Sequence, residues 1–103
     1  QKNKFEDFPD AICKLARLKR LDVSRNALTG FPKCMGGLTE LVSLDAWDND
    51  LADFPTQLSG MSSLLYLDLR NIMFELPEME HIEGLFPKAK VYFSAPCNCG
   101  STP

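Results

Sequence analysis

Hydrophobic positions alternate with polar ones over short stretches of this chain, and the stretches recur at a fixed interval. Leu21 and Val23 alternate with polar neighbours, which is the period of a β-strand with one buried face. The same alternation returns at residues 44–46 and 67–69, each 23 residues further on. Consecutive strands at this spacing must run parallel, because each coil of the chain returns in the same direction. A last strand is expected at residues 91–93.

A longer motif contains these strands. Residues 18–32 and 41–55 match one for one at every anchor of the pattern L-x-x-L-x-L-x-x-N-x-L-x-x-F-P, with an offset of 23 residues. A third copy begins at Leu64, and half a copy precedes the first from Phe5. Repetition at this period indicates a solenoid, in which no coil can bury its apolar face alone and stability comes from stacking.

The motif resembles the leucine-rich repeat family, in its class of about 23 residues with a Phe/Leu-Pro step, from Phe5 to about Phe93. The resemblance implies an α/β solenoid. This is a short arc with a parallel β-sheet on its concave face and short helical or 3₁₀ turns on its convex face. We expect a single domain over residues 1–103, divided into an N-terminal half repeat (1–17), three repeats (18–40, 41–63, 64–86) and a C-terminal cap strand with a cysteine-containing tail (87–103).

The rest of each coil is also predicted from the motif. Residues 32–38 and 55–61 are too short for a long helix and predict a helical turn or a 3₁₀ segment on the convex side. Asn26 and Asn49 stand where the chain leaves each strand, and there an amide can bond the backbone of a neighbouring coil. Leu44 and Leu67 should be fully buried.

The ends depart from the pattern, as the caps of a solenoid should. In the third copy Ile72 takes the asparagine position and Asn71 comes one residue early. Residues 78–83 predict a short amphipathic helix that ends near Gly84. The strand at 18–24 is an open sheet edge, where Lys19 and Arg20 discourage pairing with another strand.

Composition and charge narrow the function classes. The 103 residues are 45% hydrophobic and 24% charged, which is ordinary for a soluble globular domain. No apolar run reaches the roughly 20 residues of a membrane span. The net charge of -3 argues against a nucleic-acid partner.

The charge is uneven along the chain. Residues 1–34 hold eight basic and four acidic residues (+4), and the remaining residues hold three basic and ten acidic ones (-7). Such asymmetry orients a partner or a neighbouring copy, or is a chance feature of a solvated surface.

The four cysteines suggest a compartment. Their even number in a short chain favours an oxidising environment, hence a periplasmic, secreted or surface location, with the cytoplasm as the alternative. A secretory signal removed ahead of Gln1 would fit this. Residues 91–100 resemble the ending of some small secreted or surface leucine-rich repeat proteins of bacteria. Cys13 and Cys34 stand beside apolar residues, so we predict that both are buried and reduced. Cys97 and Cys99 either pair or anchor the end of the chain.

The resemblance places the binding site on the concave face, which usually binds in this family. Outward strand positions supply the candidate partner-binding residues: Arg20, Asp22, Asp45, Trp47, Tyr66, Asp68, Arg70 and Tyr92. Tryptophan and tyrosine beside arginine have the composition of a binding hot spot. Alternatively, Trp47 folds over the neighbouring strand and is structural. The aspartates at 22, 45 and 68 have two interpretations. They form an acidic stripe that binds a basic peptide or a cation, or they are simply a residue type that this repeat often has at that position, with interaction partners close by.

No motif for catalysis, a metal or a cofactor is present. A single histidine, His81, excludes sites that need two imidazoles, and no phosphate loop or nucleophile motif occurs. We therefore expect no enzyme activity, no cofactor and no metal. The leading interpretation is a non-catalytic module that binds a protein or peptide on its concave face, as a monomer or weak homo-oligomer. Two alternatives stay open: a structural or assembly unit that stacks through its open sheet edge, or a fragment of a longer solenoid. A thiol-redox role for Cys97 and Cys99 is a third.

Overall fold

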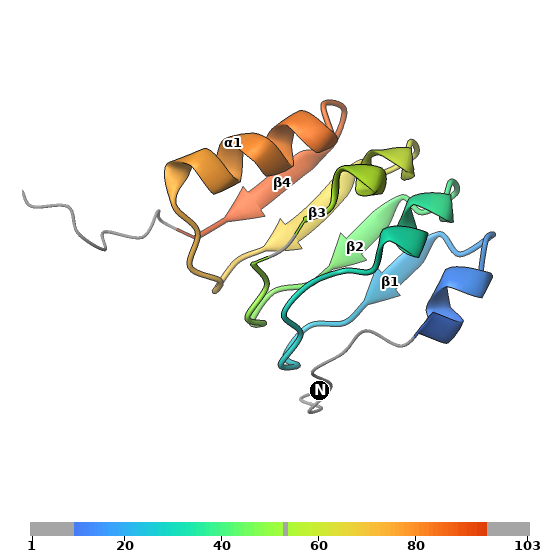
Figure 1. Ribbon diagram of the computed structural model, residues 1–103, viewed down its shortest axis with the longest axis horizontal. Helices are drawn as coiled ribbons and strands as arrows, with labels where there is room; N and C mark the ends of the chain where they lie inside the picture. The colour runs from blue at the N-terminus through green and yellow to red at the C-terminus, as the bar shows by residue number, and fades with distance from the viewer. Residues whose placement is uncertain (1–9, 53, 95–103) are drawn as a thin grey trace, which may run out of the picture.

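The computed structural model describes residues 10–52 and 54–94 as a run of short strands and helical turns (Figure 1). In chain order the elements are η1 (Asp10–Lys14), β1 (Arg20–Asp22), η2 (Lys33–Gly37), β2 (Ser43–Asp45), η3 (Thr56–Gly60), β3 (Tyr66–Leu69), α1 (Leu76–Leu85) and β4 (Lys90–Phe93), where η marks a 3₁₀ helix. Residues 1–9 of the expected half repeat and the cysteines at 97 and 99 lie outside the described residues.

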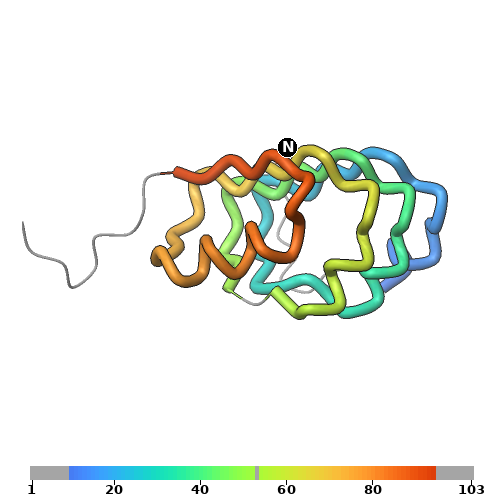
Figure 2. Tube along the Cα trace, turned by 90° about the horizontal axis from the view of Figure 1, so that it is seen from above, coloured from blue at the N-terminus to red at the C-terminus, as the bar shows by residue number. Residues whose placement is uncertain are grey.

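The strands form one parallel sheet in the order β1-β2-β3-β4. Leu21 pairs with Leu44 and Leu44 with Leu67, so the register of the first three strands repeats every 23 residues. Leu67 then pairs with Val91, one residue further on. The 3₁₀ turns and α1 lie on the opposite side of the coils from the sheet (Figures 1 and 2). The predicted α/β solenoid arc is confirmed.

The core fills the space between the sheet and the turns. Leu44 and Leu67 are each 1% exposed, as predicted. Phenylalanine rings stack through the coils, with centroids 5.7 Å apart for Phe31 and Phe54, 5.8 Å for Phe54 and Phe74, and 5.7 Å for Phe74 and Phe93. Edge contacts of this kind add to the burial of each ring. The aromatic stack therefore joins all four coils along the direction in which they pile up.

Asn49 binds two coils together where the chain turns out of the strand. Its side-chain oxygen accepts the backbone N–H groups of Asn26 and Leu28, both at 3.1 Å. Its amide nitrogen donates to the carbonyl oxygens of Val23 and Ala46. Asn49 thus satisfies backbone groups of the coil before it, as the sequence predicted, whereas the Asn26 amide bonds only carbonyl oxygens of its own coil.

Ile72 ends this asparagine ladder. Asn71 does not replace it, because Asn71 (φ 61°) is equivalent to Asp48 (φ 60°) and Arg25 (φ 61°), the left-handed residue after each strand. The Asn71 side chain donates to Asp48 Oδ1 at 3.0 Å, and its N–H donates to Ser94 Oγ at 2.7 Å. Asparagine tolerates this conformation better than most residues do. The early asparagine is therefore a turn residue, and Ile72 is buried in its place.

The last helix is longer than the sequence predicted. Residues 78–83 lie inside α1, which spans Leu76–Leu85. The Glu75 N–H donates to Glu78 Oε1 at 2.8 Å, and Pro77 lies in the first turn. These start signals extend the helix by two residues at its N-terminus.

The prediction for Cys13 and Cys34 was wrong. They form a disulfide with a Cα–Cα distance of 5.7 Å, Cys34 is exposed and Cys13 is half-buried. Ile12 and Met35 are equivalent positions of adjacent coils, 23 residues apart, and Met35 is fully buried. Cys13 follows the one and Cys34 precedes the other. Cys13 packs only partly against the core, and Cys34 is exposed. Their apolar neighbours suggested burial, whereas stacking of η1 on η2 brings them together on the surface.

Candidate functional site

The outward face of the sheet, called the concave face below, carries the eight candidate residues. The pairing puts Asp22, Asp45, Asp68 and Tyr92 in one row across the four strands. Arg20, Ser43, Tyr66 and Lys90 form the next row. Strand alternation places Trp47 and Arg70 on the same face, two residues beyond Asp45 and Asp68. Register therefore brings all eight candidates onto one surface.

Tyr66, Asp68, Arg70 and Tyr92 form a contact cluster on that face. Arg70 Nε donates to Asp68 Oδ1 at 3.0 Å and Nη2 donates to Oδ2 at 2.6 Å. The Arg70 backbone N–H also donates to Asp68 Oδ1, and the Tyr66 hydroxyl donates to Oδ2 at 3.4 Å. The rings of Tyr66 and Tyr92 are 5.2 Å apart, and the Arg70 guanidinium lies 5.8 Å from the centre of the Tyr92 ring. These contacts hold two tyrosines and one arginine in a fixed arrangement.

Asp68 is 2% exposed, so its charge depends on this cluster. Burial raises the pKa of Asp68, but the hydrogen bonds and charge of Arg70 outweigh it, and the pKa falls below its ordinary value. The carboxylate in turn raises the pKa of Arg70. Burial, and then the negative charges of Asp68 and Asp45, raise the pKa of Tyr66. The buried carboxylate is thus ionised and neutralised by an arginine whose side chain is 58% exposed.

Asp45 lies in the same row as Asp68 but receives no hydrogen bonds like those that Arg70 and Tyr66 give to Asp68. Among the described residues no hydrogen bond reaches its carboxylate, whereas the Asp22 carboxylate accepts the N–H and hydroxyl of Ser24. Burial raises the pKa of Asp45, and the charges of Asp22 and Asp68 on either side raise it further. Arg20 and Arg70 act in the opposite direction without reversing the shift. The middle of the concave face therefore carries a carboxylate that a cation would stabilise.

Trp47 stands beside Asp45 and is half-buried. Its backbone carbonyl accepts the Arg25 N–H at 2.9 Å, which continues the sheet pairing beyond β2. Within the described part of the chain its ring makes no stacking contact with another aromatic ring or an arginine. Trp47 is thus only partly covered by the rest of the described chain.

Sequence reasoning listed the members of the cluster but missed how they are joined. Asp68 lies in β3 and Arg70 follows directly after the end of that strand, two residues on, so its guanidinium reaches back to the Asp68 carboxylate. Their spacing is a usable signal, since i and i+2 side chains share a face of a strand. The residue at i+2 separates the three aspartates, because it is Ser24 after Asp22, Trp47 after Asp45 and Arg70 after Asp68.

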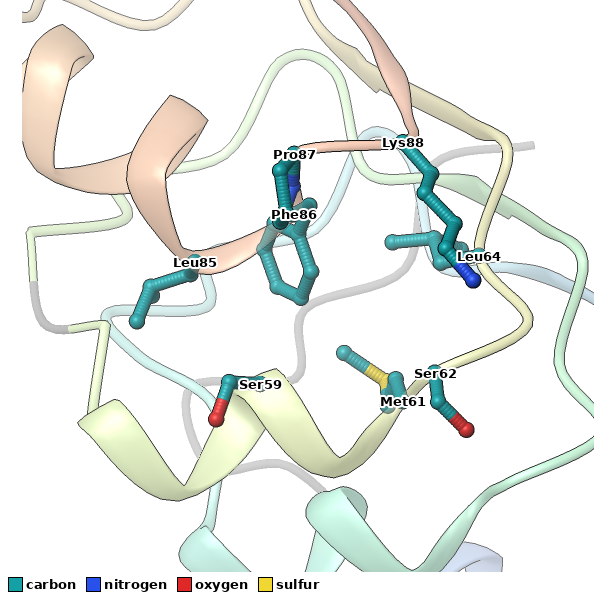
Figure 3. A pocket seen from close by; sticks show the side chains of 8 residues that line it. All are labelled: Ser59, Met61, Ser62, Leu64, Leu85, Phe86, Pro87 and Lys88. Carbon is teal, nitrogen blue, oxygen red and sulfur yellow. The ribbon is translucent and has the colours of Figure 1, made fainter.

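A pocket lies on the side of the coils opposite the sheet. A pocket of about 150 Å³ lies between η3 and the end of α1, with Met61, Leu64 and Phe86 among its lining residues (Figure 3). Lys88 reaches over its rim (Figure 3). The cavity arises where an α-helix follows a row of 3₁₀ turns, and none of the eight candidate residues lines it.

Across the described ranges, no three or more His, Cys, Asp or Glu side chains gather in a group suited to a metal ion. No helix in these ranges has the length and hydrophobicity to cross a bilayer.

Comparison with known proteins agrees with the repeat pattern. The sequence profile of the leucine rich repeat family matches residues 17–38. The structure of the leucine-rich repeat protein LIC12759 of Leptospira interrogans superposes with a TM-score of 0.84 at 32% identity, covering 88% of this chain. The chain is a leucine-rich repeat protein. It spans 23% of the length of the Leptospira protein.

Two internalins of Listeria monocytogenes share the fold of this leucine-rich repeat protein. Internalin C2 has a TM-score of 0.64 at 17% identity, over 84% of this chain and 37% of the internalin chain. Internalin F has a TM-score of 0.54 at 19% identity, over 96% of this chain and 36% of its own. No curated protein matches the sequence. All three of these solved structures are of bacterial proteins.

Proposed function

We propose that this leucine-rich repeat protein is a non-catalytic binding module that takes a protein or peptide segment on its concave face. The observation that carries the proposal is the cluster of Tyr66, Asp68, Arg70 and Tyr92. Binding energy concentrates in aromatic and arginine side chains that are held rigid before the partner arrives. Here the two tyrosines are packed together, and a buried carboxylate fixes the arginine. Solenoids of this kind commonly use their extended concave surfaces for binding.

The partner segment should carry a basic side chain opposite Asp45. That carboxylate is flanked by two other aspartates and has no hydrogen-bond donor among the described residues. A lysine or arginine from the partner would supply the missing counter-charge, and Trp47 and Tyr66 would pack against its aliphatic stem. Opposite charges across an interface of this kind favour the correct partner and raise the association rate.

An extracytoplasmic location fits the same proposal. The Cys13–Cys34 disulfide supports an oxidising compartment, because disulfides form and persist in secreted, periplasmic and surface proteins. A partner would then be met outside the cytoplasm.

Capture of partners from the native source tests the proposal. The baits are the wild type, Trp47→Ala and Asp45→Asn on the concave face, and Lys33→Ala and Gln57→Ala on the convex side as matched controls. Circular dichroism first verifies that each bait is folded. Truncating a central aromatic side chain should cost roughly 2 kcal/mol or more of binding free energy. A true partner is lost from both concave baits and kept by both convex ones. Proteins retained equally by all baits would remove the binding site from the concave face.

A further inference from the structure

The second coil, which contains β2, presents a pair of backbone amides without an acceptor. In the first coil, which contains β1, the N–H groups of Asn26 and Leu28 both donate to Asn49 Oδ1 at 3.1 Å. The equivalent N–H groups one repeat later are those of Asn49 and Leu51, and Ile72 offers them no side-chain oxygen. Among the described residues, no hydrogen bond from either N–H group is found. Asn49 and Leu51 are only 6% and 2% exposed, and native structures rarely leave buried N–H groups unpaired.

A groove separates the second coil from the third coil, which contains β3, beyond the ends of the strands. Between the first two coils, the Asp50 N–H donates to the Leu28 carbonyl oxygen at 2.9 Å, and a similar backbone bond follows two residues later. No backbone hydrogen bond joins residues 49–52 to residues 71–73 in the described ranges, and the Glu75 N–H donates instead to Glu78 Oε1 at the start of α1. The groove has a volume of about 320 Å³ and is lined by residues 49–52 and 71–73. Both coils that bound it are described, so it does not depend on how the chain begins or ends.

The groups at the groove select a neutral carboxamide. Two N–H donors do not suit a cation, and an anion is disfavoured by the carboxylates of Asp50 and of Asp48, which accepts from the lining Asn71. The Leu51 carbonyl oxygen has no donor among the described residues, whereas its equivalent at Leu28 accepts from the next coil. A ligand therefore needs a neutral oxygen with an N–H group beside it. A trans peptide group directs the two to opposite sides, whereas a primary carboxamide presents both on one edge.

We propose that this groove is a binding site for a primary carboxamide, the group that asparagine and glutamine side chains carry. The carboxamide oxygen accepts the N–H groups of Asn49 and Leu51, and the carboxamide nitrogen donates to the Leu51 carbonyl oxygen. The ligand oxygen then makes to the second coil the contacts that Asn49 Oδ1 makes to the first. The site lies beyond the ends of the strands and does not rest on the function proposed for the concave face.

Nuclear magnetic resonance of the full chain tests the site one amide at a time. The probe is N-acetyl-asparagine N-methylamide, and propanamide carries the same carboxamide without peptide groups. With either compound, we expect the amide protons of Asn49 and Leu51 to shift downfield, with a dissociation constant of about 10 mM because few hydrogen bonds form. The amide protons of Asn26 and Leu28 already have an acceptor and should not move.

Two analogues of the asparagine probe are its matched controls. The leucine analogue keeps the backbone amides and replaces the carboxamide by an apolar group, and the aspartate analogue replaces it by a carboxylate. Each should bind at least about tenfold more weakly than the asparagine probe, because one leaves the N–H pair without an acceptor and the other brings a charge near Asp48 and Asp50.

Substitution of Ile72 tests the site from the side of the protein. Ile72→Asn restores the ladder motif, so the introduced amide should accept both N–H groups and weaken probe binding by about tenfold or more. Ile72→Val keeps an apolar side chain and is the matched control, which should bind the probe as the wild type does. Circular dichroism verifies that both variants fold. If Ile72→Asn does not fold, the probe series on the wild type decides alone.

Several outcomes overturn the proposal. These are no shift of the two amide protons at about 100 mM probe, equal shifts with the leucine analogue, tighter binding of the aspartate analogue, or unchanged binding by a folded Ile72→Asn chain. A scalar coupling across a hydrogen bond from either amide of the free chain would show that another part of the chain already supplies the acceptor. That result would also overturn the proposal.

Discussion

Asp68 and Asp45 show how position decides the behaviour of one residue type on the concave face. Both are aspartates in the same row of the sheet. Arg70 and Tyr66 satisfy Asp68, whose lowered pKa makes the ionised form stabilising above its ordinary pKa of 3.8. That contribution is lost as the pH falls through the folded-state value. Asp45 has the opposite shift and no described hydrogen-bond donor.

Asp45→Asn should therefore stabilise the protein at neutral pH. The folded-state pKa of Asp45 is raised, so its favourable contribution is present below the ordinary value of 3.8 and is lost as the pH rises through the folded-state pKa. At pH 7 the substitution should raise the free energy of unfolding by roughly 0.2–1 kcal/mol, the scale of a cross-strand charge pair. Chemical denaturation at pH 7 and pH 3 checks this. A gain of equal size at both pH values would show that charge is not the cause.

The two ladder asparagines should differ in importance. Asn49→Ala removes hydrogen bonds to both coils and leaves the N–H groups of Asn26 and Leu28 without their acceptor, so it should cost about 3 kcal/mol. Asn26→Ala removes bonds within its own coil only, and should cost about 1 kcal/mol. Urea denaturation of the two variants measures the difference. Equal losses of unfolding free energy in the two variants would contradict this difference, in which Asn49 bonds the preceding coil and Asn26 bonds only its own coil.

At the scale of elements, successive 3₁₀ turns pack backbone against backbone. A Cβ added at Gly36 would overlap the carbonyl oxygen of Gln57, and one added at Gly60 would overlap the carbonyl oxygen of Gly36. A Cβ at Gly37 would meet nothing within 4 Å. Gly36→Ala and Gly60→Ala should thus cost about 1–3 kcal/mol each, while Gly37→Ala should change stability little. Thermal unfolding of the three variants compares them. A neutral Gly36→Ala would mean that η2 and η3 are further apart than described.

Most of the elements could be predicted because each follows from a local rule that recurs. The strands follow from alternation, the turns from their short length, and the buried leucines from their register. The disulfide could not be predicted, because it depends on which way two residues point from neighbouring turns. The role of Asn71 as a turn residue could not be predicted either. It depends on a left-handed backbone conformation that Arg25 and Asp48 share, and these three positions hold three different residue types.

The candidate site was predictable as a face but not as a set of contacts. Alternation and register place outward residues on one surface whatever their identity. The pairing of Arg70 with Asp68 instead depends on side-chain geometry where β3 ends. The buried state of that aspartate, in an outward row, was equally invisible in the alternation of the sequence.

For the whole molecule, the Cys13–Cys34 disulfide holds the first helical turn on the arc. No residue of η1 is buried, so the bond to η2 is a principal attachment. Closing a loop with a sequence separation of 21 should stabilise the fold by about 3 kcal/mol, and reduction should lower Tm by roughly 10–20 °C. Calorimetry with and without reductant measures the shift. The double variant Cys13→Ser, Cys34→Ser is the control and should not respond to reductant.

Footprinting of the wild-type chain tests most directly whether partners bind the concave face. Hydroxyl radicals oxidise exposed tryptophan, tyrosine and methionine side chains, before and after a captured partner is added. Trp47, Tyr66 and Tyr92 should become protected in the complex. Met73, which is 72% exposed and lies after the end of β3, should react equally in both states. Unchanged oxidation of the three aromatic residues in a verified complex would contradict the claim.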